Sequence, residues 1–134
     1  SVLVVDYNPD LLEKLMKKKI ASIYGDMSNP EVLKRINFSR AKVIISSVPK
    51  VSDNLALLKH LKEIKSKALK FVTAQNLEDS FVLYDAGADY VIIPTIMSGE
   101  RVAHLLEEFS EDRKGLNKIK REHLKHLLEI SSQN

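Results

Sequence analysis

The sequence predicts an α/β domain with three layers and a parallel sheet of about five strands. Short, continuously apolar segments alternate with amphipathic helical segments along the chain. This order is typical of a sheet that helices cover on both faces. The apolar segments are rich in β-branched residues, as buried strands are. Because the alternation continues to residue 109, the strands are expected to run parallel, with right-handed crossovers between them.

The elements are expected in the following order. Strands are predicted at 2–5, 21–24, 42–46, 70–73 and 90–93. Helices are predicted near 9–19, 29–36, 52–66, 77–86 and 98–109. The first and third helical segments repeat their apolar residues at intervals of three or four, which gives each of them one apolar face.

Several predicted helix ends have the residues that are typical of helix caps. Asn8 and Asn29 each stand before a proline, which is the pattern of a capping residue followed by Pro at the first helical position. Ser52 is expected to cap the third helix. Gly87 follows the fourth helix at a position suited to a left-handed C-terminal cap.

The chain changes character after residue 109. We expect one domain over 1–109, then a polar break and an amphipathic helix over 110–134. This helix lacks the large aromatic anchors of an interfacial membrane helix, so we expect it to dock on this domain or on a second copy.

The composition fits a single folded domain in the cytosol. The 134 residues are 44% hydrophobic, include no cysteine and contain no apolar run long enough to span a membrane. The formal charge is +3, and the basic runs at 17–19 and 113–125 are expected to be solvated helix faces. No aromatic residues interleave with them, so no nucleic acid partner is expected. The four histidines fall in predicted helices away from the sheet edge, and we expect neither an enzyme nor a metal site.

A ligand site is expected at the carboxyl ends of the strands, where open parallel sheets bind their ligands. The carboxylate of Asp6 could accept two hydrogen bonds from a ribose diol, or it could cap the following helix. Asp26 and Met27 could border a flat base. The candidate residues at this edge are Asp6, Tyr7, Asn8, Gly25, Asp26, Met27, Ser46, Ser47 and Val48.

Four motifs carry a resemblance to a known family. Residues 24–33 and 41–49 resemble the Trk-type or RCK nucleotide-binding domains that regulate potassium channels and cation transporters. Residues 6–9 fit the same pattern. Residues 84–94 resemble in particular the version fused to Kef-type cation:proton antiporters. The resemblance covers residues 2 to about 109 and implies a Rossmann-like fold.

The resemblance implies a role for each candidate. Asp6 would bind the adenosine ribose, Asp26 and Met27 would flank the adenine, and Ser46, Ser47 and Val48 would lie beside the phosphates and the second ribose. It also implies that NAD(H) or an adenine nucleotide (AMP or ATP) binds without turnover. The expected partners are a second copy, with exchange of a strand or helix as one route, and a membrane cation transporter or channel. The expected location is the inner face of the cell membrane.

The sequence departs from the family pattern in two respects. One is Gln75, which follows Ala74 where family members often carry an Arg that could contact phosphate. The other concerns the start of the fold. Family members begin with a strand and a Gly-x-Gly-x-x-Gly turn, whose amides hold a pyrophosphate. Neither occurs in this sequence, which predicts impaired dinucleotide binding. Without that central strand, three sheet arrangements are open. The strands could take the order 2-1-3-4-5 in this chain's numbering, could be exchanged with a partner, or could be completed by a separate piece.

A phosphoacceptor receiver is the alternative class. Residues 4–10 and 72–74 look receiver-like. A receiver needs an Asp after its third strand and a Lys before its final Pro, however, and this chain has Ser46 or Ser47 and Ile93 there. Only a degenerate receiver-like signalling domain, working by protein–protein interaction, is compatible with these residues.

Overall fold

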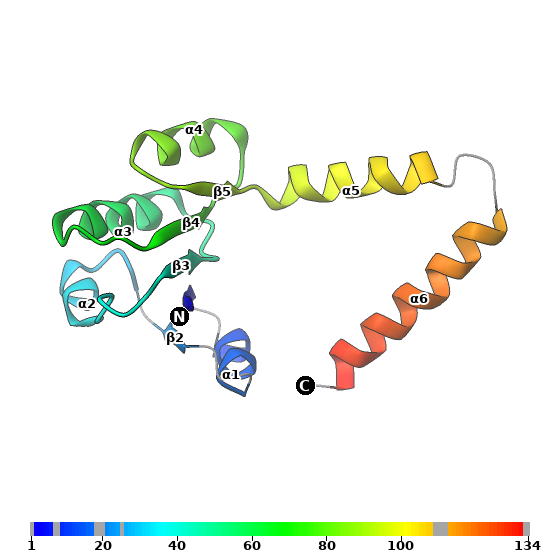
Figure 1. Ribbon diagram of the computed structural model, residues 1–134, viewed down its shortest axis with the longest axis horizontal. Coiled ribbons are helices and arrows are strands. Elements are labelled where there is room, and N and C mark those ends of the chain that lie inside the picture. The colour runs from blue at the N-terminus through cyan, green and yellow to red at the C-terminus, as the bar shows by residue number, and fades with distance from the viewer. Residues whose placement is uncertain (1, 7–8, 18–20, 25, 109–112, 133–134) are drawn as a thin grey trace. The chain divides into compact units, whose positions relative to one another are not determined.

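The computed structural model describes residues 2–6, 9–17, 21–24, 26–108 and 113–132 (Figure 1). The chain forms two compact units, Ser1–Thr95 and Ile96–Asn134. The first unit alternates strands and helices. Its elements are β1 (Val2–Asp6), α1 (Pro9–Lys17), β2 (Ala21–Tyr24), α2 (Pro30–Arg35), β3 (Val43–Ser46), α3 (Val51–Glu63), β4 (Leu69–Thr73), α4 (Leu77–Asp85) and β5 (Tyr90–Ile92).

The five strands form one sheet in the order β2-β1-β3-β4-β5, and every neighbouring pair is parallel. The predicted α/β class with a five-stranded parallel sheet is thus confirmed. The order is the first of the three arrangements considered above: β1 pairs directly with β3, with Val5 opposite Ser46. The chain runs from β1 outward to β2 and then crosses to β3. The carboxyl ends of β1 and β3 therefore form the point where the strand order reverses.

The core of the first unit consists of two clusters of buried side chains. The larger cluster includes Val5, Ile44, Leu57 and Leu61, and the smaller one includes Leu58, Val72, Leu83 and Val91. Helix α3 contributes to both clusters, since its leucines at 57, 58 and 61 are almost completely buried. Each such leucine stabilises the fold by roughly 1.5–3 kcal/mol relative to an exposed one. The position of α3 is therefore strongly determined by packing.

The start of α2 agrees with its sequence signal, and the start of α3 does not. The side chain of Asn29 accepts a 3.0 Å hydrogen bond from the amide of Glu31, which confirms it as the cap of α2. The prediction that Ser52 caps α3 is wrong: the helix begins at Val51, and Lys50 occupies the cap position without a capping side-chain bond. Burial of the α3 leucines sets this start instead of a local cap. Asn8 lies outside the described residues.

Helices α3 and α4 are each followed by a residue with a positive φ angle, which is Lys65 after α3 and Gly87 after α4. After α4, Gly87 has φ +105°, as predicted, and the amide of Ala88 bonds the carbonyl of Leu83. After α3, Lys65 has φ 53°, and the amide of Ser66 bonds the carbonyl of Leu61 at 2.9 Å. Both are the left-handed endings that satisfy the last free carbonyls of a helix.

Two helices make up most of the second unit: α5 (Pro94–Glu108), which begins just before it, and α6 (Arg113–Ser132). Helix α5 begins four residues earlier than expected, because a proline suits the first helical turn. The compact first unit ends at Thr95, so the predicted boundary at residue 109 stays a prediction. Within the described ranges, no helix is both long and apolar enough to cross a bilayer.

Candidate functional site

Asp6 and Ser47 meet at the point where the strand order reverses. Asp6 is the last residue of β1 and is buried, and Ser47 directly follows β3. The hydroxyl of Ser47 donates a hydrogen bond to Oδ2 of Asp6, and the amide of Ser47 lies 3.4 Å from the carbonyl oxygen of Val5. These two predicted site residues, which are 41 positions apart in the sequence, are therefore joined at the carboxyl edge of the sheet.

Asn54 organises the neighbouring part of this edge. Its side chain, in the first turns of α3, is fully buried. Nδ2 donates to the carbonyl oxygens of Val48 and Thr73, both at 2.8 Å, and Oδ1 accepts from the hydroxyl of Ser46 at 2.6 Å. The side chain thereby satisfies polar groups that follow two adjacent strands. Asn54 was expected only as part of the capping signal of this helix and not as a residue that organises the site, although an amide just inside a helix that follows a strand is a recognisable signal.

Ser46 and Val48 face the protein interior. Ser46 is fully buried and its hydroxyl is occupied by Asn54, while Val48 belongs to the larger core cluster. The hydroxyl of Thr73 donates a further 2.8 Å bond to the carbonyl oxygen of Ser46. Of the three predicted residues after β3, Ser47 is thus the one whose side chain lies beside Asp6.

Asp26 and Met27 follow β2 and point in different directions. Asp26 is exposed, and it accepts hydrogen bonds from the hydroxyl and the amide of Ser28. The pKa of Asp26 is held below its ordinary value, mainly by the hydroxyl of Ser28, then by its amide, with a smaller contribution from the charge of Lys50. Met27 is 1% exposed and packs in the larger core cluster. The carboxylate, rather than the thioether, is the group available at the surface.

Lys50 is a residue at this edge that the sequence reasoning missed. It sits at the cap of α3, after β3, and its charge acts on the Asp26 carboxylate that follows β2. The amino end of α3 carries a partial positive charge from its free amides. Lys50 adds a full charge to it, so this stretch of the rim can attract an anionic group. A lysine placed directly before a helix that follows a strand is the signal that could have identified it.

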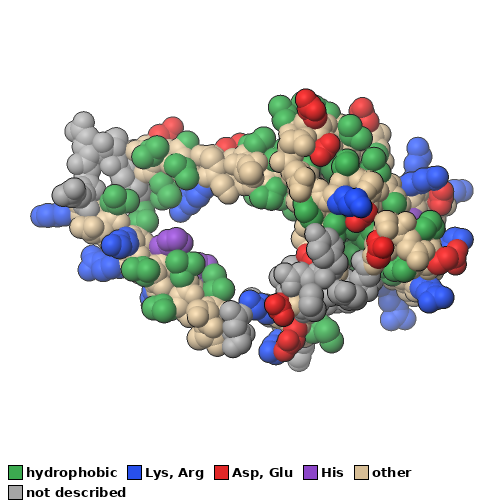
Figure 2. All heavy atoms as spheres, turned by 180° about the vertical axis from the view of Figure 1, so that it is seen from behind, with side chains coloured by type: hydrophobic (Ala, Val, Ile, Leu, Met, Phe, Trp, Pro, Cys, Tyr) green, Lys and Arg blue, Asp and Glu red, His purple; other side chains and the backbone are tan. Residues whose placement is uncertain are grey.

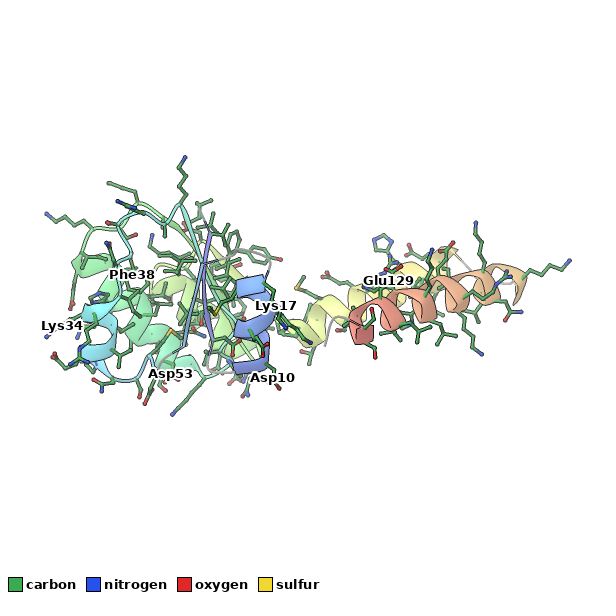
Figure 3. The ribbon with its side chains drawn as sticks, turned by 90° about the horizontal axis from the view of Figure 1, so that it is seen from below. Asp10, Lys17, Lys34, Phe38, Asp53 and Glu129 are labelled. Carbon is green, nitrogen blue, oxygen red and sulfur yellow. The ribbon has the colours of Figure 1, made fainter. Side chains whose placement is uncertain are left out.

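Asp53 is the second residue that was missed. It lies in the first turn of α3, is 8% exposed, and its Oδ1 is buried without a hydrogen-bond partner among the described residues. Figure 3 shows Asp53 and Asp10, each in the first turn of a helix, at the same edge of the first unit. Since a buried oxygen without a donor is costly, this carboxylate is suited to accept a hydrogen bond from a ligand or water.

Three of the predicted site residues, Tyr7, Asn8 and Gly25, lie outside the described residues. Within the part that is described, acidic residues and histidines do not gather in groups of three that could hold a metal. The rim as described offers carboxylates, a hydroxyl and one ammonium group. Such groups are suited to polar, hydroxyl-bearing and anionic ligands. The strand order defines a Rossmann-like domain, and its candidate binding edge lies at the strand reversal.

Comparison with known proteins identifies the family. The family model of the TrkA-N domain matches residues 1–94, and the chain belongs to this family. A relative described as probable potassium channel protein 2 of Methanocaldococcus jannaschii is 31% identical over 106 residues. That match covers 77% of this chain and 31% of the relative, so the chain spans about a third of the length of that protein.

Two solved structures share the fold at low sequence identity. The TrkA-N domain of the inner membrane protein YbaL from Escherichia coli superposes with a TM-score of 0.64 at 13% identity, over 78% of this chain and 95% of that one. The Kef C-terminal domain of Shewanella denitrificans, in an AMP-bound form, has a TM-score of 0.64 at 10% identity, over 98% and 94% of the two chains. The predicted resemblance to Trk-type and Kef-type domains is confirmed.

Proposed function

We propose that this chain is a regulatory domain that binds an adenine nucleotide and controls the transport of potassium or another monovalent cation. Its chemistry is binding without turnover. The ligand is NAD(H), AMP or ATP, held at the carboxyl edge of the sheet by the predicted residues Asp6, Tyr7, Asn8, Gly25, Asp26, Met27, Ser46, Ser47 and Val48. The proposal is supported by membership of the TrkA-N family, by the potassium channel relative and by the AMP-bound Kef domain.

The pair formed by Asp6 and Ser47 carries the proposal. A carboxylate at the end of a strand, at the reversal point, accepts hydrogen bonds from two adjacent ribose hydroxyls. The bond from Ser47 orients that carboxylate in the absence of ligand. Ser46, Val48 and Met27 act in this proposal by fixing the loops from the inside, since all three are buried. Asp26 borders the base, and Lys50 attracts the phosphate.

Regulation follows from linkage. A nucleotide that binds one arrangement of paired domains more tightly than another shifts the population of the transporter states coupled to them. The domain therefore works at the cytoplasmic face of the membrane, beside a cation channel or transporter, and as a homodimer. Apolar side chains on α5 and α6, among them Leu106, Leu116, Leu124 and Leu128, are exposed and available for pairing. Sedimentation velocity of the chain measures this: a monomer at all concentrations contradicts the dimer.

Calorimetry tests the ligand. Titration with NAD⁺, NADH, AMP and ATP is expected to show binding of at least one nucleotide. Asp6→Asn preserves the shape of the side chain and its bond from Ser47 but removes the charge that the ribose hydroxyls need. We expect it to weaken binding by roughly 10-fold, since a hydrogen bond to a charged group contributes about 1.5–3 kcal/mol.

The matched control is Asp85→Asn, which neutralises an exposed carboxylate in the last turn of α4. It is expected to bind nucleotide as the parent chain does. A well-folded protein that binds none of the four nucleotides would refute the ligand, and equal affinities for the two variants would refute the role of Asp6.

The second candidate function is a degenerate receiver-like signalling domain. The observation that favours it is the strand order β2-β1-β3-β4-β5, which also occurs in receivers. Treatment with acetyl phosphate distinguishes the two. The mass of the protein is expected to stay unchanged, because serine follows β3 where a receiver has its phosphorylated aspartate.

A further inference from the structure

The amino ends of the strands, opposite the candidate nucleotide site, carry a strong excess of positive charge. Two segments border this edge, residues 34–42 and 59–70, and both are fully described. Together they hold nine Lys and Arg residues and one Glu, whereas the whole chain has a formal charge of only +3. The amide of Leu69 bonds the carbonyl of Lys42 at 2.9 Å, so the two segments lie side by side. We call this surface the basic edge.

Among the described residues, nearby negative charge offsets only part of the charge of the basic edge. Asp89 lies beside it and is 3.9 Å from the ammonium of Lys70, and Glu31 pairs with Lys34. Helices α2 and α3 also end here, but each helix end contributes only about half a negative charge. These ends therefore account for about one charge of the excess. Figure 2 shows Lys and Arg side chains on the side of the first unit where α2 and α3 lie, on the right in this view and on the left in Figure 1.

A cleft of about 570 Å³ lies in the basic edge. Its floor is apolar and includes Phe38 and Ala68, both buried, and the ring of His60 is 5.8 Å from that of Phe38. Its rim includes Lys65 and Lys67, and none of its lining residues is acidic. Figure 3 shows Phe38 away from the edge that holds Asp10 and Asp53. The cleft is thus separate from the nucleotide site.

Exposed apolar side chains accompany the charges. Ile64, on the rim of the cleft, is 46% exposed, and Leu69, at the start of β4, is 52% exposed. Lysines on an exposed surface attract the anionic headgroups of a bilayer, and such a contact is electrostatic and requires no aromatic anchor in the acyl region. A nucleic acid surface would favour aromatic side chains for stacking, and the described rim of the cleft has none exposed.

We propose that the basic edge docks on anionic phospholipid headgroups, with Lys65 and Lys67 at the centre of the contact. This docking proposal rests on the proposed function because the proposed function places the domain beside a membrane. Attachment to a membrane protein would keep the domain close to the bilayer, so that a weak contact suffices. A nucleotide at the carboxyl edge would then act on a domain whose opposite edge is held by the membrane surface.

Co-sedimentation with vesicles tests the docking. The full chain is mixed with vesicles of phosphatidylcholine alone and with vesicles of an equimolar mixture of phosphatidylcholine and phosphatidylglycerol. Binding is expected for the mixed vesicles alone and is expected to weaken steeply with added salt. The double variant Lys65→Glu/Lys67→Glu should lose roughly 10-fold or more in partitioning, because each lysine near an anionic surface contributes to it.

The matched control is Lys118→Glu/Lys120→Glu, which changes the net charge by the same amount on exposed positions of α6. It should lose less than about 3-fold, since only the long-range field changes. Three outcomes overturn the proposal: no binding to the mixed vesicles, an equal loss in both variants, or displacement of the bound chain by a duplex oligonucleotide. Nucleotide calorimetry reports on the opposite edge, so either proposal can fail while the other stands.

Discussion

Nδ2 of Asn54 donates a 2.8 Å hydrogen bond to the carbonyl oxygen of Thr73, 19 residues further along the chain. The same nitrogen bonds the carbonyl of Val48, so one side chain connects the loop that follows β3 with the last residue of β4. Because the amide is fully buried, neither carbonyl has water as an alternative partner. Asn54 therefore helps to hold the rim beside the reversal point, together with the bond from the hydroxyl of Thr73 to the carbonyl of Ser46.

Asn54→Ala is expected to lower the free energy of unfolding by roughly 3 kcal/mol, because it leaves two carbonyls and the hydroxyl of Ser46 without a partner in the interior. The measurement is urea denaturation followed by circular dichroism. Asn76→Ala is the control, since Asn76 caps α4 from an exposed position, and its loss should cost about 1 kcal/mol. Equal costs for the two variants would show that the buried network contributes nothing beyond a cap.

Ser28→Ala is expected to raise the pKa of Asp26 toward its ordinary value, because the hydroxyl of Ser28 is the largest cause of its lowering. A carboxylate with a lowered folded pKa stabilises the fold above its unfolded pKa, and this stabilisation disappears as the pH falls through the folded value. Carbon-13 NMR titration of the Asp26 carboxyl measures the shift. The amide of Ser28 still donates in the variant, so only part of the lowering should disappear. An unchanged titration would contradict the assignment.

Lys65→Gly is expected to stabilise the first unit by about 0.5–1 kcal/mol, because a residue with a Cβ is strained at φ 53° and glycine is not. The reciprocal change, Gly87→Ala, should destabilise by about 1 kcal/mol through the backbone alone, since a Cβ at Gly87 meets no atom within 4 Å. Urea denaturation of both variants measures the pair. Effects of the same sign would refute the explanation.

Lys50→Ala is expected to weaken the binding of AMP by about 3- to 10-fold and to leave adenosine binding nearly unchanged, if Lys50 interacts with phosphate by charge as proposed. Calorimetry with both ligands separates the phosphate from the nucleoside. Lys59→Ala, an exposed change in the middle of α3, serves as the control. A parallel loss for AMP and adenosine would assign Lys50 to the fold of the rim instead.

The strands and their parallel pairing could be predicted because each strand is a short apolar run between strong helix signals. The cap of α2 was predictable for a similar reason, since Asn29 and the following proline are local signals. The start of α3 was not, because the buried leucines on that helix fix its position more strongly than the serine that was expected to cap it.

The site was predictable only in part. The proximity of Asp6 and Ser47 follows from the carboxyl ends of adjacent parallel strands. The burial of Met27 could not be read from its position after β2, because it depends on packing against distant residues such as Leu33 and Phe38. Lys50 and Asp53 were not predicted as site residues. The role of Lys50 depends on its position near Asp26, and the role of Asp53 depends on a buried oxygen that has no hydrogen-bond partner among the described residues. Only the folded structure defines these two relationships.

The Asn54 network has a mechanical consequence. Its bonds join the loop after β3 to the end of β4, and the bond from Ser47 joins the same loop to Asp6 at the end of β1. We expect a ligand that contacts Asp6 to compete with the hydroxyl of Ser47 for the carboxylate, while the Asn54 bonds keep the loop after β3 in place beside β4.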